Sequence, residues 1–211
     1  MSVYNPANKC NPYQIAIDLD DTLSCFGETW LAMYNEKSGD NLTLEQITDW
    51  EIDKFILPEW RGRVLSEEIV YSEGFYDKVP VKEGAVEFMR WACDNFRAAI
   101  VSATRHDAVA DKARWIQKHF PFFDIKDFII CHDKQAIKAH VLIDDGLHNL
   151  YGFRGGKILI DRPWNQESDT DQITENLRVD NLMDIQRLGT GFFLHWAPCK
   201  ERGGNHARAI Q

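Results

Sequence analysis

The chain has 211 residues, 44% of them hydrophobic and 27% charged, which is the composition of an ordinary globular protein. This length suffices for one α/β domain with a real core, or for a core domain with a small insertion. The net charge of −9 argues against a nucleic-acid duplex as partner. Because no run approaches 18 apolar residues and no signal peptide is visible, we expect no membrane contact. Five scattered cysteines without a C-x-x-C pair indicate a reducing, cytoplasmic location.

The first predicted element is a strand that ends in a cluster of acids. Residues 14–22 read QIAIDLDDT, in which the apolar run 15–17 precedes Asp18, Asp20 and Asp21. A buried parallel strand delivers such side chains to the carboxyl edge of its sheet. Residues two apart leave a strand on the same side, so Asp18 and Asp20 can face one group. Crowded carboxylates favour a divalent cation, and the alternative is an acidic turn after an edge strand.

The segment that follows this strand predicts a small helical cap. Phe26 and Tyr34 belong to a helical repeat, and Thr43 with Gln46 forms a capping box that begins a second helix. Pro58 interrupts the pattern, and another helix is predicted over 59–70. Residues 25–80 are therefore expected to form a cap inserted after the first strand, above its acidic end.

From residue 81 strands and helices alternate, which predicts a parallel sheet with right-handed crossovers. We predict an α/β fold whose doubly wound core, residues 1–24 and 81–188, has a five-stranded sheet. A further helix is expected either from residue 173 or 174 to 178, or over 182–188, and the tail 189–211 as irregular. The predicted strands are 15–17, 98–102, 128–130, 141–143 and 157–160, with helices over 83–95 and 106–119 and a short helix or turn over 134–139.

Polar side chains stand at the ends of three later strands. Ser102 closes the second strand, Lys134 follows the third, and Asp144 with Asp145 follows the fourth. A hydroxyl and an ammonium group in these places suit a phosphoryl group, although such a serine is usually a turn residue and such a lysine usually a solvated one. The second pair of acids again favours a metal.

Taken in order, these features resemble the four motifs of the haloacid dehalogenase superfamily of phosphotransferases. They are D-x-D-x-T at 18–22, Ser102, Lys134, and Asp144 with Asp145. The resemblance implies a Rossmann-like core with Asp18 as nucleophile and Asp20 as general acid and base. It also implies that Ser102 and Lys134 bind phosphate. Mg²⁺ would be held by the Asp18 carboxylate, the Asp20 backbone carbonyl and one acid of the last pair, with Asp145 favoured over Asp144.

Within that superfamily, residues 15–145 resemble the 5′(3′)-deoxyribonucleotidases. The similar pieces include Phe26, Trp50, Gly74-Phe75-Tyr76, and Asp133-Lys134 ahead of Leu142-Ile143-Asp144-Asp145. The resemblance implies a nucleoside monophosphate substrate, with Phe26, Trp50 and Phe75 of the cap around the base and sugar. Ala103, His132 and Gly146 depart from the family's usual residues and leave the preferred substrate open.

Other interpretations stay open at this stage. The enzyme could act on another ester, such as a sugar phosphate or a nucleic-acid 3′-phosphate, or the chain could be a non-catalytic module with the same fold. The cap aromatics could simply form the cap's own core. A homodimer is also left open. His195, Cys199 and His206 in the tail fit no zinc-binding spacing well, so we do not expect a metal there.

Overall fold

The computed structural model describes residues 14–166 and 176–194, and its centre is a single parallel sheet. The strand order is β3-β2-β1-β4-β5-β6. The chain therefore adds β2 and β3 on one side of β1, and then β4, β5 and β6 on the other side. The predicted α/β fold is confirmed, but the sheet has six strands where five were expected. The strands are β1 (Gln14–Asp18), β2 (Arg97–Ser102), β3 (Phe128–Ile130), β4 (Val141–Asp144), β5 (Gly156–Ile160) and β6 (Asn176–Val179).

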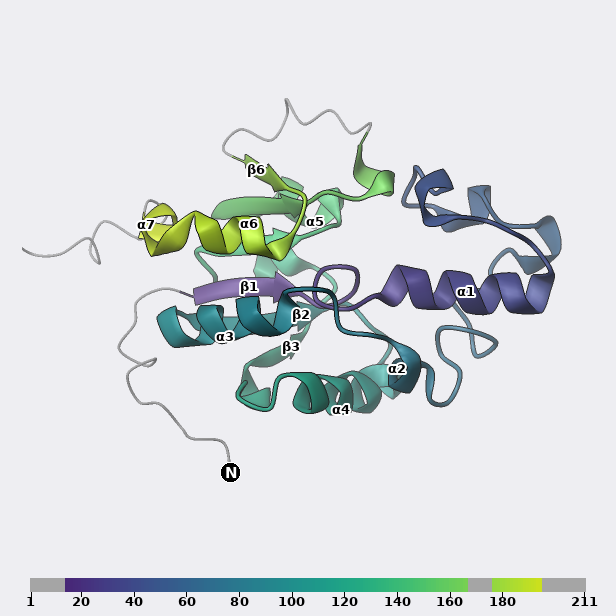
Figure 1. Ribbon diagram of the computed structural model, residues 1–211, viewed down its shortest axis with the longest axis horizontal. Coiled ribbons are helices and arrows are strands. Elements are labelled where there is room, and N and C mark those ends of the chain that lie inside the picture. Colours follow the sequence, from purple (N-terminus) through teal and green to yellow (C-terminus); the bar gives the residue numbers. More distant parts are fainter. Residues whose placement is uncertain (1–13, 167–175, 195–211) are drawn as a thin grey trace, which may run out of the picture.

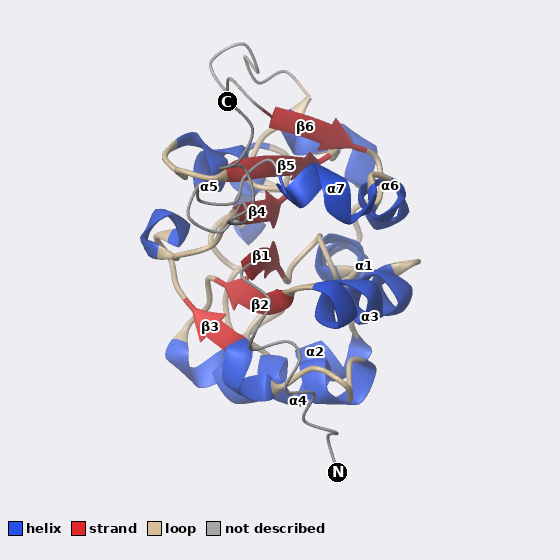
Figure 2. Ribbon diagram, turned by 90° about the vertical axis from the view of Figure 1, so that its left-hand side faces the viewer, coloured by secondary structure: helices blue, strands red, loops and turns tan. Residues whose placement is uncertain are grey.

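Helices cover both faces of this sheet (Figure 2). The helices are α1 (Phe26–Ser38), α2 (Phe75–Lys78), α3 (Ala85–Asn95), α4 (Val109–His119), α5 (Leu147–Tyr151), α6 (Leu182–Arg187) and α7 (Gly189–Leu194). None of these described helices is long and apolar enough to cross a membrane.

Successive side chains of a strand point to opposite faces of the sheet, so alternate strand residues belong to two separate hydrophobic clusters. Ile17 and Ile143 pack with the larger cluster, which includes residues of α3, α4 and α6. Ala16 and Leu142 point the other way, into a smaller cluster with α5. Burial on both faces makes these strands almost continuously apolar, which is why they were recognisable in the sequence.

The segment between β1 and α3 lies beyond the carboxyl ends of the strands (Figure 1). Its two ends are tied together, because Cys25 N–H donates to the Pro80 carbonyl at 2.9 Å and Lys82 N–H to the Leu23 carbonyl at 3.0 Å. Long α1 and short α2 bracket several 3₁₀ turns. The division at residues 25 and 80 stays a prediction, and this geometry is compatible with it.

The helix expected either up to residue 178 or over 182–188 is present in its second form, α6, while residues 176–178 belong to the strand β6 that was not predicted. Two other local predictions were wrong. In place of a helix over 59–70 there is a 3₁₀ turn at Pro58–Trp60 followed by turns, and Gly62 adopts a φ of 71°. The tail is helical at its start, because α7 places Phe193 against Trp91 and Phe96, with ring centroids 5.8 and 4.9 Å apart.

Candidate active site

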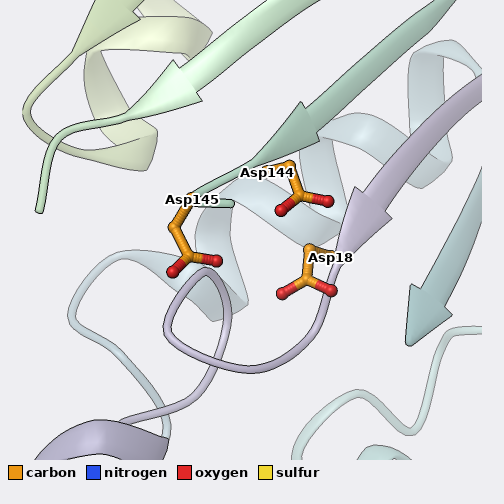
Figure 3. Close-up of side chains that lie close together, drawn as sticks. All are labelled: Asp18, Asp144 and Asp145. Carbon is orange, nitrogen blue, oxygen red and sulfur yellow. The ribbon is translucent and has the colours of Figure 1, made fainter. Parts of the chain in front are cut away.

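The sheet brings two of the predicted acidic motifs together. Ile17 on β1 pairs with Ile143 on β4, so Asp18 and Asp144 leave neighbouring strands side by side. The strand order reverses here, and open α/β sheets bind ligands in the crevice at such a point. Figure 3 shows Asp18, Asp144 and Asp145 grouped at the carboxyl ends of these two strands. One carboxylate oxygen from each lies within 4.8 Å of the others.

Lys134 lies between two of these acids. Its Nζ donates to Asp144 Oδ2 at 2.6 Å and to Asp18 Oδ1, and its side chain is almost fully buried. Burial alone would lower the pKa of Lys134, but the Asp18 and Asp144 carboxylates raise it above its ordinary value. Burial raises the pKa of Asp18, and Lys134 opposes this rise. The ammonium group therefore offsets part of the charge that the sheet gathers here.

The remaining oxygens show how the acid cluster could hold a metal ion. Asp144 Oδ1 accepts hydrogen bonds from Gly146 N–H at 2.8 Å and Asn149 Nδ2 at 3.0 Å, so both of its oxygens are engaged. Asp145 Oδ2 accepts from Trp164 Nε1 at 2.9 Å. Burial raises the pKa of Asp18 and of Asp145, so these acids ionise more readily when a cation is beside them. With all three carboxylates ionised, the single ammonium leaves two negative charges, and oxygen ligands are those Mg²⁺ prefers. The cluster fits a divalent metal site, and the preference for Asp145 over Asp144 as direct ligand stays a prediction.

Asp20 lies in a second, adjoining cluster. Lys112 Nζ donates to Asp20 Oδ2 at 2.6 Å and to Ser102 Oγ at 2.7 Å, while Tyr76 Oη donates to Asp20 Oδ1 at 2.5 Å. Burial, together with the charge of Asp20, raises the pKa of Tyr76. Asp18 and Asp20 thus contact different partners, and the predicted roles of Asp20 and Ser102 toward one phosphoryl group stay predictions.

An apolar pocket of about 140 Å³ adjoins the acid cluster. Two of its lining residues link it to the cluster, because Trp164 Nε1 donates to Asp145 and Asp21 lies three residues after Asp18 in the chain. The lining residues are Asp21, Phe26, Trp30, Ile47, Asp49, Trp50, Ile52, Leu65 and Trp164.

The three predicted cap aromatics differ in their relation to this pocket. Phe26 and Trp50 line it, and Trp50 is 53% exposed, with its ring 4.5 Å from that of His148 on α5. Phe75 is 1% exposed and does not line the pocket; it packs edge-on behind Phe26, with ring centroids 5.6 Å apart. The structure therefore brings Phe26 and Trp50 together and places Phe75 in the layer that supports Phe26.

Sequence reasoning did not assign roles to Lys112, Tyr76, Asn149 or Trp164. Lys112 carried a usable signal, because it lies three and four residues before the buried Trp115 and Ile116 on α4. A lysine on the buried face of a helix needs a charged partner. The other three had no such signal. His195, Cys199 and His206 lie outside the described residues.

This chain is similar in sequence to known nucleotidases. Residues 11–189 match the family described as 5′ nucleotidase, deoxy (Pyrimidine), cytosolic type C protein. A 5′(3′)-deoxyribonucleotidase of Clostridium acetobutylicum is 33% identical over 159 residues, which are 75% of this chain and 87% of that protein. One of Bacillus subtilis is 32% identical over 178 residues, 82% of this chain and 96% of that protein.

Solved structures show the same fold at low identity. A haloacid dehalogenase-like hydrolase of Streptococcus pneumoniae superposes with a TM-score of 0.57 at 12% identity, covering 83% of this chain and 97% of that one. A HAD-hydrolase of Bacillus subtilis bound to magnesium gives a TM-score of 0.54 at 14% identity, with the same coverage of 83% and 97%.

Proposed function

Because the chain belongs to the cytosolic type C 5′-deoxynucleotidase family, and is thus a phosphoric monoester hydrolase, we propose that it converts deoxyribonucleoside monophosphates to nucleoside and inorganic phosphate. One observation carries the choice of substrate: the aromatic pocket adjoins the acid cluster through Asp21 and Trp164. A phosphoryl group at the acids would leave the apolar body of the ligand beside Phe26 and Trp50, where a base can stack.

In the proposed reaction Asp18 attacks phosphorus in line, and the bond between phosphorus and the ester oxygen breaks. Asp20 gives its proton to the leaving oxygen, which departs as the nucleoside alcohol. Asp20 then takes a proton from water, and the resulting hydroxide releases phosphate from the aspartyl-phosphate and restores Asp18. Lys134 and Ser102 hold the phosphoryl oxygens. The contact between Lys134 and Asp18 supports this scheme, because the ammonium favours the ionised nucleophile.

We propose that Mg²⁺ is bound by the Asp18 carboxylate, the Asp20 backbone carbonyl and Asp145. When bound, such an ion neutralises phosphoryl charge and orients the group for attack. The excess of two negative charges in the cluster of Asp18, Asp144, Asp145 and Lys134 supports a divalent ion. The cytoplasmic location stays a prediction, as does the homodimer that we left open.

Family membership favours an enzyme over the non-catalytic module, and leaves a different phosphate ester as the alternative. The test is phosphate release from 5′- and 3′-monophosphates of deoxyribonucleosides and ribonucleosides, beside sugar phosphates, with Mg²⁺ and with chelator. We expect chelator-sensitive turnover that is highest on deoxyribonucleotides. Turnover on sugar phosphates alone would contradict the substrate, and full activity in chelator would contradict the metal.

The nucleophile is tested with Asp18→Asn, which keeps the side-chain volume and removes the attacking carboxylate. Asp94→Asn is the matched control, since Asp94 is exposed on α3 and contacts none of the site. We expect no turnover in the first variant and unchanged turnover in the second. Full activity of Asp18→Asn would refute the mechanism.

A further inference from the structure

One residue that lines the pocket beside the acid cluster has a buried carboxylate that the proposed mechanism does not use. Asp21 lines this pocket and is only 7% exposed. Apart from Asp21 and Asp49, the residues that line the pocket carry no ionisable group. A carboxylate buried against aromatic and aliphatic side chains is unfavourable unless hydrogen-bond donors reach it.

The backbone of Asp21 is held in an unusual conformation. Its φ is 57°, the only positive value for a non-glycine residue among those the structure describes. Arg162 fixes the peptide, because its Nε and Nη2 donate to the Asp21 carbonyl at 3.0 and 2.7 Å. A non-glycine residue persists in the left-handed region when its surroundings determine it, and such positions are frequent at ligand sites.

The side chain of Asp21 is oriented as firmly as its backbone. Gly27 N–H donates to Oδ1 at 2.7 Å. The carboxylate lies so close to Gly27 that a Cβ there would be 2.9 Å from Oδ1 and 3.2 Å from Oδ2. The start of α1 therefore fixes one oxygen of Asp21 and leaves the other without a hydrogen bond from any described residue.

Asp49, the other carboxylate of the pocket, is different. Its Oδ2 accepts from Lys54 Nζ at 2.6 Å and its Oδ1 from Glu51 N–H at 2.9 Å. Within the described part of the chain, then, Asp21 Oδ2 is the carboxylate oxygen of the pocket's lining residues that accepts no hydrogen bond. Burial raises the pKa of Asp21 to about 7. In its ionised form Oδ2 accepts and cannot donate, so a hydrogen-bond partner of that form carries an O–H or N–H group.

The position of Asp21 indicates which part of the ligand supplies that group. Asp21 is three residues from the proposed nucleophile Asp18, and it shares the pocket with Trp164, which bonds Asp145. It thus lies where the pocket meets the acid cluster. In a nucleoside monophosphate the sugar stands between the phosphoryl group and the base, and the deoxyribose of a 5′-monophosphate has one free hydroxyl, at C3′.

We propose that Asp21 is a specificity-determining residue whose Oδ2 accepts a hydrogen bond from the 3′-hydroxyl of a deoxyribonucleoside 5′-monophosphate. This inference rests on the proposed function and names the sugar contact of the same site. The site rejects nucleotides that lack a donor at C3′, because the buried oxygen is then left without a partner.

The test compares thymidine 5′-monophosphate with its 3′-deoxy and 3′-fluoro analogues; the fluoro compound replaces the hydroxyl with a group of similar size that cannot donate. In the parent protein we expect kcat/KM to fall about 10- to 100-fold for both analogues. Asp21→Gly permits the same backbone φ and removes the carboxylate, so the three substrates should then differ by less than about threefold.

Asp21→Asn separates this role from a structural one, because its carbonyl oxygen can still accept from Gly27 N–H and asparagine tolerates the left-handed region. We expect Asp21→Asn to weaken discrimination against both analogues, and the control Asp49→Asn to leave the ratios unchanged. Equal kcat/KM of the parent on all three substrates would overturn the inference, as would equal losses on all three in the Asp21 variants. Parent turnover of thymidine 5′-monophosphate tests the proposed function separately, and its absence would overturn both.

Discussion

Lys112 provides the sharpest test of how the site is held together. Its side chain is 3% exposed and its Nζ reaches Asp20 Oδ2 at 2.6 Å, Ser102 Oγ at 2.7 Å and the Ala103 carbonyl at 3.3 Å. Lys112→Met keeps an unbranched chain and removes all three hydrogen bonds. Each buried polar group left without a partner costs about 1–3 kcal/mol. The Asp20 side chain is 21% exposed and water can solvate it, so we expect the free energy of unfolding to fall by about 1–3 kcal/mol in total.

The effect on catalysis should be of the same size as the effect on stability, since 100-fold corresponds to about 2.7 kcal/mol. Asp20 loses its charged donor and keeps Tyr76 Oη at 2.5 Å and Ser102 Oγ at 3.5 Å, so we expect kcat/KM to fall about 100-fold, mostly through kcat. The assay is steady-state phosphate release beside urea denaturation, with Lys118→Met on the exposed face of α4 as control. A positioning role for Lys112 would be refuted if the Lys112→Met enzyme lost the expected free energy of unfolding but kept a kcat/KM within about twofold of the parent's.

Three further predictions follow from the contacts. Lys134→Met should lower the free energy of unfolding in chelator by about 3–5 kcal/mol, since it leaves buried carboxylates unpaired. Mg²⁺ should raise the Tm of this variant more than that of the parent; no rise of the Tm in either protein would contradict the metal site. Gly27→Ala should lower stability by about 1–3 kcal/mol, because the new Cβ would lie 2.9 Å from Asp21 Oδ1; an unchanged Tm would contradict the close contact. Burial lowers the pKa of His119 below 6.5, so the unfolded chain binds the proton first and stability falls as the pH drops below that value. His119→Gln should reduce the loss of Tm between pH 6.5 and pH 5, whereas exposed His106→Gln should not.

Two of the wrong predictions concern short segments, where tertiary contacts outweigh local pattern. Residues 176–179 form a strand because the edge of β5 offers unpaired backbone groups, and Leu159 pairs with Arg178 there. Nothing in the four letters NLRV distinguishes that strand from part of a helix. Likewise, α7 depends on the packing of Phe193 against Trp91 and Phe96, a contact that the local sequence pattern does not predict.

The sequence by itself determined the order of the first five strands, and the placement of Asp18, Ser102, Lys134 and the last acidic pair at or after strand ends. Apolar runs followed abruptly by polar residues are local signals, and the chirality of parallel crossovers then constrains the topology. The tertiary structure alone decided which side chains meet. Lys112 reaches Asp20 across 92 residues, and Trp164 reaches Asp145 across 19. Such contacts depend on strand register and helix rotation, which many weak interactions set jointly along the whole chain, so no single stretch of sequence encodes them.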